Sequence, residues 1–402
     1  MCVEIGEIPH ALLAIIEQGQ CGVTMFFVLS GFLISHIFQA IRKKGDRSLL
    51  ECWKIFLYRR FWRIWPALIV SVFLVQGFAS VWSGYSFMSA CGTGEFWSVM
   101  WRNMCLIWNL KSWADEPGCE LSPEVEWSVS TEFQLYLFTP LFVEAYIRRK
   151  RFGWIVCTAV MGVSLLLRYW MIESDKLWHE KTVFLHEGYT TAMYSEQNIL
   201  YFSSYTRANE YMIGIMAHFV WGELKDMRES KGQYERNWQT NLWSALVSVP
   251  GQVVVYGTWA VVEIWLFWNR FYWNGHYDRT VETYYLMYNW WIMSLVTGYV
   301  IISCCAMPRD SITFINKFMS KCLSSQALYP VAAVSYTAYL LQYLAWWDLS
   351  LPSVTNIWTF TFWEIILFIQ ACFIGLGLSL LVERPCMKMG RWLEPYVFPA
   401  KS

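Results

Sequence analysis

The sequence is poor in charged residues. Lys, Arg, Asp and Glu make up 15% of the 402 residues and cancel to a net charge of zero, whereas a soluble domain carries about 25% charged residues. Hydrophobic residues reach 56% of the chain. This balance excludes an ordinary soluble domain, and the zero net charge gives no reason to expect a nucleic-acid partner.

Several sequence signals are also missing. The first ten residues, MCVEIGEIPH, lack the basic start and apolar core of a secretory signal, so we expect an internal span to direct membrane insertion. The twelve cysteines include no CxxC pair, and we expect no metal site. A disulfide among Cys91, Cys105 and Cys119 is left open. Without a solenoid repeat or a Pro/Gly/Ser-rich linker, the chain is predicted to form a single membrane domain over 1–402.

Apolar runs near twenty residues long are what the sequence has in abundance. They predict an all-α fold, a polytopic helical membrane bundle with about nine transmembrane spans. Segment 96–110 is apolar but short and carries Arg102, so we expect it to lie at the interface. The expected spans are 21–40, 64–83, 127–147, 152–172, 207–223, 241–268, 286–306, 330–348 and 357–381.

Lys and Arg gather on one side of these expected spans. Of the 31 in the chain, 23 lie in five segments that hold eight, four, four, three and four: 41–63, 148–151, 224–240, 307–329 and the tail from 382. The side richer in Lys and Arg is usually cytosolic. We therefore expect an integral, multi-pass membrane protein with a cytosolic C-terminus, in which 173–205 is the largest extracytoplasmic loop.

An acidic residue lies inside the expected span 127–147. A helix-start pattern, Ser-Pro-Glu at 122–124, places Glu132 about 15 Å further along the helix axis. Ser128, Glu132 and Tyr136 then share one face, at i, i+4 and i+8. Because a carboxylate near hydrocarbon is costly, we predict a functional polar site around Glu132. The alternative is a structural ion pair that fixes helix packing.

Two further patterns concern helix packing. Glu126, Ser130 and Gln134 form a second polar stripe on the same span, which favours a hydrated cavity or a hydrogen-bond network over lipid contact. Ser30 and Gly31 interrupt an apolar run and predict the close approach of a neighbouring helix.

Arginines cluster where the cytosolic loop enters the expected span 64–83. Arg59 precedes Arg60 and Arg63, which are one helical turn apart. The planar guanidinium suits the recognition of phosphate or carboxylate. The alternative is a topogenic cluster that anchors the helix end to anionic lipid.

Six blocks together resemble a known family. They occur in the order found in acyltransferase 3 proteins, membrane O-acyltransferases that include O-antigen acetyltransferases and the nose-resistant-to-fluoxetine proteins. The resemblance covers about residues 20 to 390. The blocks are FFVLSGFLIS, YRRFWRIWP, WSVSTEFQLYLFTP, TRANEYMIGIMAHF, VSYTAYLLQ and LVERP.

The resemblance implies a transferase of acyl groups other than aminoacyl groups. An acyl group, often acetyl, would move from acyl-CoA, a co-substrate and not a bound cofactor, to a hydroxyl of a carbohydrate or lipid-linked acceptor. By the resemblance, His10 is the general base, Arg60 and Arg63 bind the donor phosphates, and Glu132 orients the base or the hydroxyl. Other candidate substrate-binding residues are Ser128, Tyr136 and Arg207, and Arg207 is also the best ion partner for Glu132.

The sequence departs from the family pattern in two places. Family members carry a complete span before the histidine, whereas nine residues precede His10, so the first family span is expected to be missing. The late YLxH block reads YLLQ, with Gln342 in the histidine position. These departures leave open a coincidental role for His10 and a catalytically inactive membrane scaffold. A transporter is a weaker alternative, because no inverted repeat accompanies the buried charges.

Overall fold

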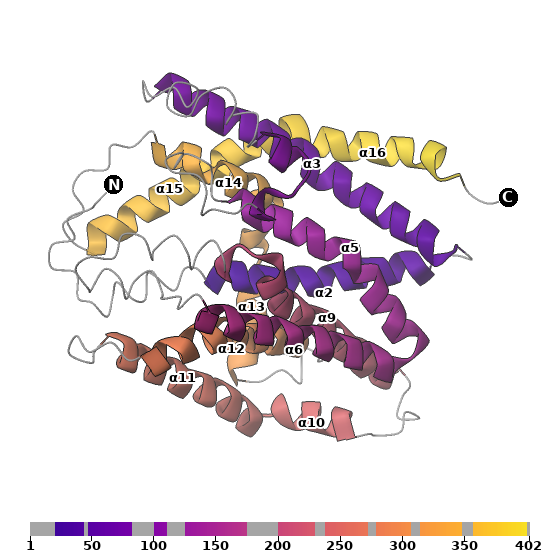
Figure 1. The fold of residues 1–402 in the computed structure, drawn as a ribbon, viewed down its shortest axis with the longest axis vertical. Coiled ribbons are helices and arrows are strands. Elements are labelled where there is room, and N and C mark those ends of the chain that lie inside the picture. The colour runs from indigo at the N-terminus through magenta and orange to yellow at the C-terminus, as the bar shows by residue number, and fades with distance from the viewer. Residues whose placement is uncertain are drawn as a thin grey trace. The chain divides into compact units, whose positions relative to one another are not determined.

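The structure, a computed structural model, is helical throughout the residues that it describes. These residues are 21–43, 47–82, 100–110, 125–174, 200–229, 238–271, 279–306, 314–347 and 357–399. Within these ranges no residue belongs to a β-strand, which confirms the all-α prediction. Figure 1 shows the helices along the chain. The α-helices are α2 (Cys21–Lys43), α3 (Leu49–Trp82), α5 (Glu126–Arg148), α6 (Lys150–Ser174), α9 (Ser204–Glu229), α10 (Trp238–Leu246), α11 (Val249–Phe271), α12 (Arg279–Ala306), α13 (Phe314–Leu323), α14 (Tyr329–Trp347), α15 (Ile357–Leu378) and α16 (Arg384–Val397).

The count of about nine spans is not supported. Within the described residues, four helical stretches are long and apolar enough to cross a membrane: Cys21–Lys43, Lys150–Ser174, Thr283–Cys305 and Thr361–Val397. Helices such as α5 and α9 carry polar and charged side chains along their length, which lowers their hydropathy below that of a simple lipid-facing span. Four apolar helices still indicate an integral membrane protein.

The described chain separates into two compact units. The first comprises the described parts of Asp46–Gln134 and Gln326–Ser402, and the second comprises those of Ala14–Gly45 and Leu135–Ser325. The single domain expected from the sequence stays a prediction. Most of the expected loop 173–205 lies outside the described residues.

In the second unit, α2 and α9 approach each other through glycines. A Cβ added to Gly31 of α2 would overlap the carbonyl oxygen of Tyr211, and one added to Gly214 of α9 would overlap that of Val28. The helices α6 and α12 pack against α9 as well (Figure 1). The close approach predicted from Ser30 and Gly31 is therefore confirmed, and Gly214 is its counterpart on α9.

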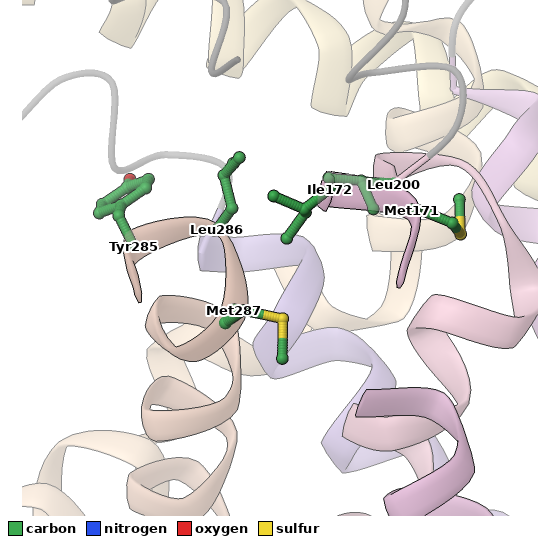
Figure 2. Packing of buried hydrophobic residues seen from close by; sticks show 6 residues of the cluster. All are labelled: Met171, Ile172, Leu200, Tyr285, Leu286 and Met287. Atoms are coloured by element: carbon green, nitrogen blue, oxygen red, sulfur yellow. The ribbon is translucent and has the colours of Figure 1, made fainter. Parts of the chain in front are cut away.

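An apolar cluster closes one end of this helix group. Figure 2 shows that Ile172 of α6, Leu200 before α9 and Leu286 of α12 belong to it. Ile172 and Leu200 are fully buried. Removing such aliphatic side chains from water stabilises a fold by roughly 1.5–3 kcal/mol each. The remaining members of the cluster are Met171, Tyr285 and Met287.

The first unit is built on α3. The helices α14 and α16 pack against α3, and α15 packs against α14, with a Cβ on Gly375 of α15 overlapping the backbone of Ala338. Five π-helical residues, Ser379–Glu383 (η7), separate α15 from α16. In Figure 1, α16 lies along α3.

Residues 100–110 also belong to the first unit. Residues 100–104 are helical, and a short 3-10 helix, η2 (Trp108–Leu110), follows. Between them, Leu106 has a φ of 56°, which is uncommon for a residue with a side chain. The described part of the segment is too short to span a bilayer, and the interfacial position expected for 96–110 stays a prediction.

The glycine contact between α2 and α9 predicts a position-specific effect on stability. Gly214→Ala should lower the melting temperature because overpacking costs about 1–3 kcal/mol. Gly222→Ala is the matched control on the same helix, because a Cβ there meets nothing within 4 Å. That control should leave the melting temperature unchanged or raise it, since Ala favours helix over Gly. Thermal unfolding in detergent compares the two variants, and equal melting temperatures would contradict the contact.

Candidate functional site

The start of α5 places two polar stripes against different neighbours in the first unit. The predicted start at 122–124 lies outside the described residues. On the first stripe, the hydroxyl of Ser128 is 2.8 Å from that of Tyr339 on α14. The same Tyr339 hydroxyl donates to the carbonyl of Val125 at 3.3 Å. Ser128 is thereby fixed to α14 at the first turn of α5.

Glu132 lies one turn further along the same stripe and is 6% exposed. It interacts electrostatically with Tyr336 of α14, as do Arg63 of α3 and Glu383 of η7. The hydroxyl of Tyr336 donates to the carbonyl of Ile64 at 2.9 Å. Because Ile64 directly follows Arg63, this bond ties α14 to the part of α3 that carries the arginines.

Glu383 is held by its own π-helical turn. The hydroxyl of Ser379 donates to Oε2 of Glu383 at 2.8 Å, and both residues are buried. A π-helical turn inserted between α-helices often marks a functional position. The Tyr336 phenol thus interacts electrostatically with two carboxylates and with the exposed guanidinium of Arg63. We call Arg63, Glu132, Tyr336 and Glu383 the tyrosine cluster.

The arginines of α3 have different surroundings. Arg59 pairs with Glu394 of α16, with 2.8 Å between Nε and Oε2, and this bond raises the pKa of its guanidinium. Arg60 is buried, with its guanidinium carbon 5.7 Å from the centre of the Phe56 ring. Arg63 belongs to the tyrosine cluster. Arg60 is therefore the buried arginine of this group, whereas Arg59 and Arg63 are exposed.

The second stripe of α5 docks the segment 100–110. Asn103 donates to a carboxylate oxygen of Glu126 at 2.6 Å. Gln134 donates to the carbonyl of Leu106 at 2.9 Å and to the side chain of Asn109 at 2.8 Å. The carbonyl of Leu106, the residue with the positive φ, thus has a hydrogen-bond donor. The second stripe is a hydrogen-bond network, one of the two alternatives that the sequence left open.

Tyr136 belongs to the second unit. Its hydroxyl is 3.0 Å from that of Ser30 on α2, and both residues are buried. The bond lies beside the glycine contact of α2 with α9. The role of Tyr136 in substrate binding stays a prediction.

Arg207 is enclosed in a buried ion cluster of the second unit. Its Nη1 is 3.3 Å from Oε1 of Glu210, and the Nη2 of Arg168 is 3.8 Å from the same oxygen. Both guanidiniums lie over the ring of Trp290, with their central carbons 4.1 and 4.4 Å from its centre. Arg207 also donates to the carbonyl of Tyr201 at 2.8 Å. These contacts favour a structural role, and the proposed pairing with Glu132 stays a prediction.

Two expectations, the role of His10 and the disulfide, fall wholly or partly outside the described residues. The role of His10 as a base is therefore a prediction alone. Cys91 and Cys119 are also outside, whereas Cys105 is an exposed free thiol. Gln342 lies on α14 and is partly buried.

Sequence reasoning did not single out Tyr336, Tyr339 or Glu383. All three lie in blocks that the resemblance uses, VSYTAYLLQ and LVERP. The two tyrosines are three residues apart and so share a face of α14, and Glu383 is an acid at the end of an apolar run. The spacing of the two tyrosines and the acid after the apolar run are the features of the sequence from which these residues could have been predicted.

Comparisons with known proteins agree with the family resemblance at low identity. The chain is 26% identical to the peptidoglycan O-acetyltransferase OatA of Listeria monocytogenes, over 51% of this chain and 30% of that protein. It is 23% identical to the nose resistant to fluoxetine protein 6 of Caenorhabditis elegans, over 94% of this chain and 46% of that protein. It is 28% identical to the acyltransferase MdmB of Streptomyces mycarofaciens, over 40% of this chain and 38% of that protein.

The chain therefore spans less than half the length of each of these relatives. No family model matches it, and no solved structure matches it. Taken with the apolar helices, the similarity to these relatives agrees with an integral membrane protein that resembles the acyltransferase 3 family.

The ion cluster predicts that Glu210 is essential for stability. Glu210→Gln removes the anion that Arg168 and Arg207 share, and a buried pair broken on one side costs about 3–5 kcal/mol. Glu223→Gln is the control, because that buried acid on α9 accepts a hydrogen bond from the neutral hydroxyl of Tyr146, at 2.9 Å. Thermal unfolding should show a much larger loss for Glu210→Gln. Equal losses would mean that the ion pairs contribute little.

Proposed function

We propose that the protein is a membrane-embedded acyltransferase that moves an acyl group, acetyl in the first instance, from acyl-CoA to a hydroxyl of a carbohydrate or lipid-linked acceptor. The observation that carries the proposal is the electrostatic interaction of both Arg63 and Glu132 with one half-buried phenol, that of Tyr336. Sequence resemblance alone had assigned Arg63 to the donor and Glu132 to the reacting groups. A grouping of these two residues is what a transfer site requires.

The proposed reaction needs a base, an anion-binding group and an orienting group. The acceptor hydroxyl oxygen attacks the thioester carbonyl, forming a C–O bond while the C–S bond breaks. His10, as the base, takes the hydroxyl proton, and that proton passes to the departing CoA sulfur. Arg60 and Arg63 bind the donor phosphates. No metal or bound cofactor takes part in this scheme.

Glu132 is proposed to hold the base or the acceptor hydroxyl in place. A carboxylate that is 6% exposed interacts strongly with nearby protons and charges because little water screens it. Ser128, one turn before it and bonded to Tyr339, is proposed to line the same substrate site. Tyr136 and Arg207 are proposed as further substrate-binding residues on the basis of the resemblance.

A catalytically inactive relative that acts as a membrane scaffold is the second candidate. The observation in its favour is Gln342, which occupies the position of the family histidine and cannot exchange a proton. Measurement of turnover separates the two candidates.

The donor assignment predicts a specific kinetic change. Replacing Arg60 and Arg63 together by Ala should raise the KM for acyl-CoA more than it lowers kcat, because the pair contacts a remote part of the donor. Arg59→Ala is the matched control, since Arg59 is engaged with Glu394. An unchanged KM in the double variant would leave the arginines as topogenic charges.

The proposed reaction predicts that free CoA is released only when an acceptor is present. The purified protein in nanodiscs would be supplied with acetyl-CoA and a panel of sugar acceptors, beside a control without acceptor. Glu132→Gln should lower the rate by at least about 100-fold without changing the melting temperature. Ser130→Ala, on the other stripe of the same helix, is the control that should keep the rate.

Loss of turnover in His10→Ala would identify the base. Turnover that survives this change but not Glu132→Gln would place the base elsewhere in the chain. Absence of turnover in the unmodified protein, with every acceptor, would favour the scaffold.

A further inference from the structure

The last helical run is too long for one crossing of a membrane. The stretch Thr361–Val397 has 37 residues and would extend about 55 Å as one straight helix, against roughly 30 Å of hydrocarbon. The 22 residues of α15 alone are about 33 Å long. Once α15 crosses the membrane, α16 has to lie outside the hydrocarbon.

The composition changes at the π-helical turn η7, where such a turn commonly redirects a helix. No charged residue follows Glu364 in α15, whereas α16 carries Arg384, Lys388, Arg391 and Glu394 among 14 residues. In Figure 1, α16 lies along α3. The charged helix therefore begins where the membrane span ends.

One face of α16 is fixed to α3. A Cβ on Gly390 would overlap the ring of Trp62, and the hydroxyl of Tyr58 donates to the carbonyl of Gly390 at 3.0 Å. Glu394 pairs with Arg59. These contacts hold the helix at the level where α3 carries its arginines, and they determine which of its faces remain open.

The first open face is a cationic stripe. Arg384, Lys388 and Arg391 are exposed and fall at i, i+4 and i+7, so they share one side of the helix. Among the residues that the structure describes, none of the three forms an ion pair. Their charges are therefore available to an anion outside the protein.

An apolar stripe lies beside the cationic one, about 100° around the helix. Met389, Trp392 and Tyr396 fall at i, i+3 and i+7 and are 45, 66 and 73% exposed. The rings of Trp392 and Tyr396 are 5.6 Å apart. Trp and Tyr are enriched at the boundary between headgroups and hydrocarbon, and this boundary is where the length of α15 places the start of α16.

We propose that α16 is an interfacial helix that binds the headgroups of anionic phospholipids through Arg384, Lys388 and Arg391, while Met389, Trp392 and Tyr396 insert below them. A basic amphipathic helix with aromatic residues on its apolar face has this behaviour in general. The lipid surface is favoured as the occupant because the helix continues directly from a membrane span and offers cations beside inserting aromatics. Each cation near an anionic surface contributes roughly a fivefold gain in affinity.

The test compares lipid binding by the full-length protein and its variants. Native mass spectrometry of the detergent-purified protein would measure the binding of phosphatidylserine and of phosphatidylcholine. Phosphatidylserine should bind more tightly, and changing Arg384, Lys388 and Arg391 together to Gln should remove that preference. Trp392→Ala with Tyr396→Ala should weaken the binding of both lipids.

Changing Arg149, Lys150 and Arg151 to Gln is the matched control, because it removes the same charge from another exposed cluster. This control should keep the preference. Equal losses in both triple variants, or no loss in the α16 variant, would overturn the proposal, as would equal competition by inorganic phosphate. If the triple variant fails to fold, Lys388→Gln alone should lower the preference roughly fivefold. Lys388→Arg, which keeps the positive charge, should leave the preference unchanged.

Discussion

The cost of placing charged and polar groups out of reach of water organises both units. A charge at the centre of a bilayer costs several kcal/mol unless it is paired or hydrated. In the second unit, Arg168 and Arg207 share Glu210 and lie over Trp290. In the first, the buried acids Glu132 and Glu383 interact electrostatically with Tyr336. Each group is accommodated by neighbours within its own unit.

The two charged groups differ in a way that bears on function. The guanidiniums of the second unit are covered by aromatic rings and bonded to a carbonyl and to a carboxylate, an arrangement suited to fixing helices. The tyrosine cluster joins residues of α3, α5, α14 and η7, the elements that carry four of the six family blocks. The proposed chemistry is therefore assigned to the first unit.

The sequence alone predicted the all-α class and the close helix approach at Gly31. These features follow from local composition and from the small size of glycine, both of which can be read directly. The count of about nine spans is not supported, because helices such as α5 and α9 carry polar and charged side chains along their length and only four described helices are long and apolar enough to cross a membrane. The partners of Glu132 were missed for a different reason.

Helical periodicity showed that Ser128 and Glu132 share a face, but it did not show what that face meets. The contacts with Tyr339 and Tyr336 join residues more than 200 positions apart, and no local pattern specifies them. The choice between Arg207 as a substrate ligand and Arg207 as a structural cation likewise depended on the positions of Glu210 and Trp290. The resemblance supplied the candidate residues, whereas their grouping required the fold.

The two stripes of α5 limit where residues can be inserted into or deleted from this sequence. Ser128 and Glu132 face α14, whereas Glu126 and Gln134 face residues 100–110. Inserting one residue near position 127 would rotate everything before it by about 100° relative to everything after it. The side chain of Glu126 would then turn away from Asn103, while Gln134 would keep its hydrogen bonds to residues 100–110. Surface loops of homologous chains can therefore vary in length, whereas the interval from Glu126 to Gln134 has to keep its number of residues.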